Sequence, residues 1–198
     1  MKTLKTGCRL LMLIAAILYI PEVKAQDVAI KTNLAYDATA SANLGMEFAL
    51  TQQWTLDVSG NLNAWNMPND MKWKHWFVQP EARYWFCEKF AGHFLGIHAH
   101  SGQYNVGGIP NNINFLGTDF SRLSNSRFQG WFAGGGIAYG YAFILGKHFN
   151  LELELGIGYS YTRYDRFECA GCGRKVEENK EHHYVGPTKA AVNLVYLF

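Results

Sequence analysis

The stretch LELELGIGYSYTRY, residues 151–164, alternates between two kinds of side chain. Apolar or aromatic residues occupy every second position from Leu151 to Tyr161, and Glu152, Glu154 and small residues lie between them. A period of two predicts a β-strand with one apolar and one polar face. A soluble sheet would turn the apolar face to a core, whereas a membrane barrel would turn it to lipid and point the Glu residues inward. The rest of the chain has to distinguish the two.

The first 25 residues predict a secretory signal. Lys2, Lys5 and Arg9 form a basic start, LLMLIAAILYI is an apolar run, and VKA ends in a small residue, so we expect cleavage after Ala25. The alternative is a retained anchor helix, but the run is shorter than the roughly 20 residues that span a bilayer. The predicted organisation is a signal peptide over 1–25 and one outer-membrane β-barrel domain over 26–198.

Charge and composition narrow the class of protein. The 198-residue chain carries a formal charge of +2, and removal of the predicted signal takes away a net +3, which leaves about −1. No basic excess remains, so no nucleic-acid partner is expected. Aromatic residues make up 15% of the chain, and no later apolar run is long enough for a membrane helix. If the protein spans a membrane, it must do so with strands.

Alternation predicts eight strands. They are residues 28–36, 44–50, 54–65, 76–86, 95–100, 131–145, 151–164 and 189–198. Pro80 in the fourth predicts a bulge or a locally weakened pairing, because proline cannot donate to the ladder.

Connection lengths alternate as well. TQQ, EKFAG and GKHF are short, while the longest links span Tyr104 to Phe128 and Phe167 to His183. Short turns at one end and long loops at the other are typical of outer-membrane barrels. The fold class is therefore predicted as all-β, an eight-stranded antiparallel up-and-down transmembrane β-barrel with short periplasmic turns and longer external loops.

Aromatic residues gather near both strand ends and predict two interface girdles. At the short-turn end these are Trp54, Phe86, Phe94, Phe143, Phe149, Tyr196 and Phe198; at the other end they are Tyr36, Trp65, Trp76, Trp131, Tyr159 and Tyr161. A soluble lipocalin-like barrel is the alternative. It would bury the apolar face, yet the opposite face carries Glu, Asp, Lys, Arg and Asn in quantity.

The chain ends VNLVYLF, an alternating segment with a terminal aromatic. Such an ending resembles the signal that the barrel assembly machinery recognises in outer-membrane barrels. In this chain Tyr196 and Phe198 would form that signal. The segments KTNLAYDATASANLGMEFAL, WTLDVSGNLNAW, KWKHWFVQPEARYWFC, GQYNVGG and HYVGPTKAAVNLVYLF resemble a family of small Bacteroidota outer-membrane β-barrel proteins, classified as a domain of unknown function (number 3575). The resemblance implies a link to fimbrial or surface assembly and supplies no catalytic residues.

The predicted inward face collects five acids and three bases. They are Lys31, Glu47, Asp57, Glu81, Arg83, Glu152, Glu154 and Lys189. In one narrow lumen these groups would form a hydrogen-bonded ion network, because isolated charges there are very costly. The network either fills and orders the barrel or forms a proton or ion path.

Two further groups of residues suggest chemistry. His98 and His100 share a face, but Ser101 has the opposite parity, which disfavours a lipid-modifying enzyme with a Ser nucleophile. The CAGC segment predicts a disulfide between Cys169 and Cys172, with a metal site involving His182 and His183 as the alternative. Cys87 would stay unpaired. No cofactor and no metal are predicted.

The function expected from the sequence is a structural or surface-interaction role of an outer-membrane barrel, exercised through its external loops. The alternatives are a lipid-modifying barrel enzyme and a narrow channel. The expected partners are outer-membrane lipid and lipopolysaccharide, the barrel assembly machinery, and a surface or fimbrial protein.

Overall fold

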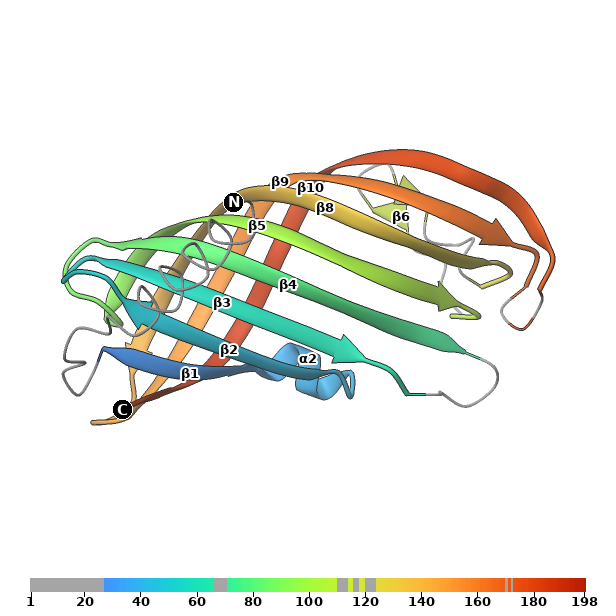
Figure 1. Cartoon of the computed structure of the whole chain (residues 1–198). Coiled ribbons are helices and arrows are strands. Elements are labelled where there is room, and N and C mark those ends of the chain that lie inside the picture. The colour runs from blue at the N-terminus through green and yellow to red at the C-terminus, as the bar shows by residue number, and fades with distance from the viewer. Residues whose placement is uncertain are drawn as a thin grey trace, which may run out of the picture.

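The structure is a computed structural model that describes residues 27–65, 71–109, 114–115, 118–119, 124–169, 171 and 173–198. The predicted signal segment, residues 1–25, lies outside the described residues. Eight antiparallel strands close into one barrel in the order β1-β2-β3-β4-β5-β8-β9-β10, with β10 returning to pair with β1 (Figure 1). This confirms the predicted all-β, eight-stranded antiparallel ring. No helix in the described part of the chain is long and apolar enough to cross a membrane.

The strands lengthen along the chain. β1 has 6 residues, β5 has 16 and β10 has 23. The bounds are β1 Val28–Asn33, β2 Ala42–Ala49, β3 Trp54–Asn63, β4 Lys72–Trp85, β5 Gly92–Gly107, β8 Arg127–Ile144, β9 Phe149–Phe167 and β10 Lys175–Leu197. A small hairpin of β6 (Asn114–Phe115) and β7 (Thr118–Asp119) lies apart from the ring. Because the short turns align one end, the other rim is slanted, and β8, β9 and β10 extend past the first strands (Figure 1).

Burial shows which face of the strands is inside. In β9, Glu152 and Glu154 are 0% and 2% exposed, whereas Leu155 is 72% exposed. The same parity holds in β3, where Asp57 is buried and Leu56 and Val58 are exposed. The barrel therefore has a polar interior and an apolar exterior, the reverse of a soluble protein.

The interior changes character along the barrel axis. At the short-turn end, Trp85, Phe90 and Phe94 form a buried apolar cluster with Ala29 and Val195. Charged residues fill the next level, and His98 and His100 lie above them along β5. Phe94 was predicted to belong to the outer girdle, and that prediction is wrong. Its ring is fully buried and lies 4.6 Å from Trp85.

Residues 34–36 form part of a helix, not the predicted strand. α2 (Leu34–Ala38) begins because the Asn33 side chain accepts a hydrogen bond from the Ala35 N–H, as an N-cap does. Tyr36, which was predicted to lie in the outer girdle, packs instead on the Phe77 ring at 5.7 Å. The Asn33 amide also accepts from the Val192 N–H and donates to the Ala190 carbonyl, so it extends the β1–β10 ladder where β1 ends.

Most of the predicted loop from Phe167 to His183 is strand. β10 begins at Lys175 and pairs with β9 as far as Phe167, so only residues 168–174 connect them. Three register shifts interrupt β10, and the one between Pro187 and Lys189 inverts the inward parity. The strand is therefore difficult to recognise from the sequence, because the residues before and after the shift alternate with opposite parity. The link between β5 and β8 is likewise shortened to residues 108–126.

Pro80 interrupts one ladder only. It lies opposite Val58 of β3, but neither Gln79 nor Pro80 has a partner in the β4–β5 ladder. The pairs on either side, Val78 with Ser101 and Glu81 with His98, keep the same register. The weakened pairing predicted at this position is confirmed, and a bulge is not formed.

Candidate functional site

The centre of the interior is the guanidinium of Arg83, which is 0% exposed. Its Nε donates to Glu81 at 2.6 Å, its Nη1 to Glu47 at 2.9 Å and Glu152 at 3.2 Å, and its Nη2 to Glu154 at 2.8 Å. Nη2 is also 3.6 Å from Asp57. One side chain of β4 therefore contacts carboxylates from β2, β3, β4 and β9. The planar fork of five N–H donors on arginine permits this, and an ammonium group could not do it.

Two lysines flank Arg83 on strands next to each other in the ring. Lys31 of β1 donates to Glu152 at 2.8 Å and is paired with Glu47, and it lies 3.8 Å from Asp57. Lys189 of β10 donates to Glu81 at 2.8 Å and lies 3.1 Å from Glu154. The structure thus brings all eight of the predicted lumen charges into one contiguous network.

Uncharged residues that sequence reasoning missed complete this network. Thr55 donates to Glu47 and accepts from the Trp85 indole N–H, which joins the charges to the apolar cluster below. Asn193 donates to Glu152 at 3.5 Å. Gly96, opposite Arg83, leaves room, because an added Cβ would lie 2.6 Å from the Glu81 carboxylate. Thr55, Asn193 and Gly96 all have inward parity, and this parity is the sequence signal that could have identified them.

Five carboxylates face three basic side chains, a formal excess of two negative charges. An uncompensated buried charge costs several kcal/mol, and here four of the carboxylates accept hydrogen bonds while Asp57 has ion-pair contacts with Lys31 and Arg83. Arg83 also lies over the Phe94 ring, 4.6 Å from its centroid, and gains a cation–π contact. The charged side chains therefore stabilise one another inside the barrel, and their contacts link the strands that carry them.

His98 connects the network to the irregular part of β10. Its Nε2 is 2.9 Å from Thr188 Oγ1, and its Nδ1 is 3.6 Å from Glu81. The order hydroxyl, imidazole, carboxylate is that of a hydrolase triad. However, Glu81 accepts from Arg83 and Lys189, and 3.6 Å is too long for a hydrogen bond. The contact instead fixes Thr188, which lies where the β10 register shifts.

Ser101 lies on the other side of the wall from the two histidines. Its hydroxyl donates to the Phe132 carbonyl at 3.2 Å, and the side chain is exposed, whereas His98 and His100 are buried. The opposite parity predicted from the sequence is the one observed.

A cavity of about 30 Å³ lies between the network and α2, lined by Lys31, Asp57, Gln79, Tyr36 and their neighbours. This volume exceeds the roughly 10–15 Å³ that a cavity needs in order to hold a water molecule.

The cysteines are only partly described. Cys169 is disulfide-bonded, whereas Cys172, its predicted partner, lies outside the described residues, so the pairing stays a prediction. Cys87 is an exposed free thiol. His183 Nδ1 lies 2.6 Å from the Tyr159 hydroxyl. Within the described ranges, no group of three or more His, Cys, Asp and Glu side chains is placed to hold a metal ion.

The predicted assembly signal lies on the outer face of the last strand. Tyr196 and Phe198 are 39% and 50% exposed, and their rings are 5.2 Å apart. The Phe198 N–H donates to the Val28 carbonyl, so the chain end forms part of the seam that closes the ring.

Residues 10–198 match the family described as Protein of unknown function (DUF3575). The chain belongs to this family. The match confirms the resemblance carried by the quoted segments, while the Bacteroidota origin stays a prediction. No curated protein and no solved structure was found to match the chain. The DUF3575 description assigns no activity, so function has to be inferred from the barrel itself.

Replacing Arg83 by Ala should lower the free energy of unfolding by about 3–5 kcal/mol, because it leaves buried carboxylates without their shared cation. The matched control is Arg174→Ala. Arg174 lies 3.8 Å from Glu168 and is 81% exposed, and such surface pairs contribute about 0–1 kcal/mol. Equilibrium urea unfolding followed by tryptophan fluorescence measures both. Equal effects of the two substitutions would show that the network does not hold the barrel together.

Proposed function

We propose that the protein is an outer-membrane β-barrel with a sealed interior, which acts as a structural or surface-interaction protein through its outer face and external loops. The observation that carries the proposal is the inverted burial. Charged side chains such as Arg83, Glu47 and Glu152 are fully buried, while Leu155, Ile97 and Ile137 are 72%, 69% and 59% exposed.

The exposed apolar side chains form a belt, not scattered patches. In β9 every outward residue from Phe149 to Tyr159 is apolar or aromatic, and the outward residues of β3 and β8 continue the belt around the ring. In water such a continuous surface would drive association or aggregation. In a bilayer it would contact hydrocarbon, and a tilted strand needs roughly 9–11 residues to cross it.

Exposed aromatic residues border the belt at both ends. Trp54, Phe143 and Phe149 lie near the short turns, and Trp76 and Trp131 lie toward the long connections. Aromatic rings at these two levels are typical of the interfaces of membrane barrels. The predicted signal segment and the exposed rings of Tyr196 and Phe198 support export and assembly in the outer membrane.

A sealed interior favours an interaction role over a channel. The Trp85, Phe90 and Phe94 cluster closes the short-turn end, the Arg83 network fills the middle, and Tyr36 of α2 packs on Phe77 near the other end. Eight strands leave an interior just wide enough for side chains. The surfaces that remain available for binding are the outer wall and the extended ends of β8, β9 and β10. A surface or fimbrial protein would bind there.

The full-length protein should fractionate with the outer membrane and migrate faster on gels before heating than after. The closed barrel keeps its compact shape in detergent until heat breaks the strand ladders. Membrane fractionation followed by gels of boiled and unboiled samples measures both properties. Folded protein recovered from the soluble periplasm would refute the membrane assignment.

Purified protein in planar bilayers should give no steady single-channel currents, because side chains fill the interior at three levels. Arg83→Ala should give small, brief currents where it folds, since it removes the central side chain, and Arg174→Ala should behave as wild type. Large, steady channels from the wild-type protein would show instead that the interior is a pore and that its charges select ions.

A further inference from the structure

Two outward rows of residues cross the wall just above the apolar belt. In the lower row, cross-strand pairing aligns Leu62, Trp76, Gln103, Trp131 and Arg163 from β3 to β9. The upper row aligns Lys74, Asn105, Gln129 and Asp165. The outward neighbours below, which include Val78, Ala133 and Tyr161, are apolar, small or aromatic. The wall thus changes from apolar to tryptophan and then to amide and charged groups within two steps along each strand.

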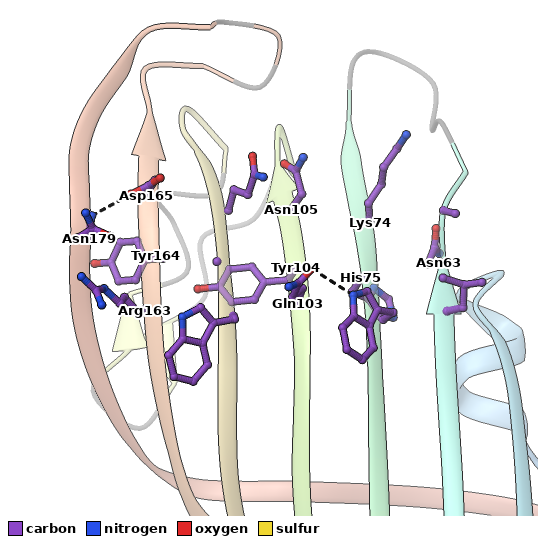
Figure 2. A pocket seen from close by; sticks show the side chains of 16 residues that line it. Asn63, Lys74, His75, Gln103, Tyr104, Asn105, Arg163, Tyr164, Asp165 and Asn179 are labelled. Atoms are coloured by element: carbon purple, nitrogen blue, oxygen red, sulfur yellow. Dashed lines mark hydrogen bonds between the residues drawn. The ribbon is translucent and has the colours of Figure 1, made fainter. Parts of the chain in front are cut away.

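These two rows line a groove of about 690 Å³ (Figure 2). Trp76 and Trp131 form its lower border, and the Trp76 indole N–H donates to Gln103 at 3.2 Å. Three amide side chains, those of Gln103, Asn105 and Gln129, lie in the middle of the groove. Their donors and acceptors match the hydroxyl groups of a sugar, and the indole faces suit its C–H groups.

Cations stand at both sides of the amides. Lys74 belongs to β4 and Arg163 belongs to β9. These two strands are three interstrand spacings apart in the ring, a distance of about 14 Å. Neither side chain is within ion-pair distance of a carboxylate among the described residues. Lys72 and Arg127 follow in the next outward row, so the wall above the groove is also basic.

Two carboxylates near Arg163 are occupied by other groups. Asp165 accepts from the Asn179 N–H at 2.8 Å and pairs with Lys175 at 2.9 Å (Figure 2 shows the Asn179 bond). These contacts hold the pKa of Asp165 below its usual value, so it remains ionised and keeps Lys175 at the groove margin. Glu181 lies opposite Arg163 and hydrogen-bonds to Tyr161. Arg163 thus lies beside two carboxylates that have other partners, and Lys72, Lys74 and Arg127 make the β4 to β8 side of the groove basic.

We propose that this groove binds the headgroup of an outer-leaflet glycolipid that carries two phosphates, one at Lys74 and one at Arg163. Its sugar hydroxyls meet Gln103, Asn105 and Gln129, and its acyl chains run down the apolar wall below Trp76 and Trp131. The inference rests on the proposed membrane location and names the lipid that this location presents to the groove. The spacing of two cations across a row of amides distinguishes it from a site for a single phosphate.

The test uses purified full-length protein in detergent micelles and native mass spectrometry with defined lipids. Diphosphoryl lipid A should bind about tenfold more tightly than monophosphoryl lipid A, since a charge-assisted hydrogen bond contributes about that factor or more. Lys74→Ala and Arg163→Ala should each remove most of this difference, whereas Lys74→Arg should retain it. Lys147→Ala, which removes an exposed cation in the turn at the opposite end, is the matched control.

Three results would overturn the proposal. They are equal binding of the two lipids, an equal loss with Lys147→Ala, and binding of inorganic phosphate as tight as that of the lipid. Every variant is first checked for faster gel migration before heating, which reports a folded barrel. If the wild-type protein folds and inserts into vesicles but shows no preference for the diphosphoryl lipid, the groove proposal fails and the membrane function stands. If the protein is soluble, both fail.

Discussion

The Arg83 guanidinium contacts all five carboxylates that the strands bring into the barrel. Those carboxylates come from β2, β3, β4 and β9, and Lys31 and Lys189 add β1 and β10. Apart from the cluster around Trp85, Phe90 and Phe94, the described part of this ring has few buried large apolar side chains, because most of them point outward. The interior must therefore be held by polar contacts, and these are favourable only when every charge has a partner. The layers of the interior and the position of Thr188 both depend on this arrangement.

The seam between β1 and β10 shows how short and long strands can be joined. β1 pairs with only the last part of β10, from Asn193 to Leu197. Past that point the Asn33 side chain takes the place of a backbone peptide group, and the chain turns into α2. The long upper part of β10 then pairs with β9 alone among the described strands. The slanted rim places polar and basic side chains of β4 to β9 above the apolar belt, where the proposed groove lies.

Much of the fold could be predicted because period-two alternation is a local property. Each strand core between Val28 and Phe198 shows it, and the parity of Lys31, Arg83 and Glu152 placed these residues inside before any contact was known. Features that depend on distant partners could not be predicted in the same way. Phe94 is predicted as a girdle residue because it is aromatic and close to a short turn, but it shares the parity of His98 and lies on the inward side beneath Arg83. The register shifts of β10 hid half of that strand.

The outer groove was missed for a related reason. Trp76 and Trp131 were predicted as girdle residues, but no site was predicted for Gln103, Lys74 and Arg163, because they are far apart in the sequence. Strand pairing brings them into two adjacent rows. Lys74 and Arg163 lie one outward step above the predicted girdle residues Trp76 and Tyr161, whereas Gln103 lies between Trp76 and Trp131 in the same row, which depends on the strand order.

In the proposed membrane barrel, the outward face of residues 151–164 contacts lipid while Glu152 and Glu154 are enclosed in the interior. Nitroxide labels at Leu153, Leu155 and Ile157, with Arg174 as a loop reference, test it directly in protein reconstituted into vesicles. Collision rates with oxygen, which concentrates in hydrocarbon, should be high at the three strand positions, and rates with a water-soluble nickel complex should be high only at Arg174. High nickel-complex collision rates at Leu155 would contradict the membrane location, because they would place the apolar face in water.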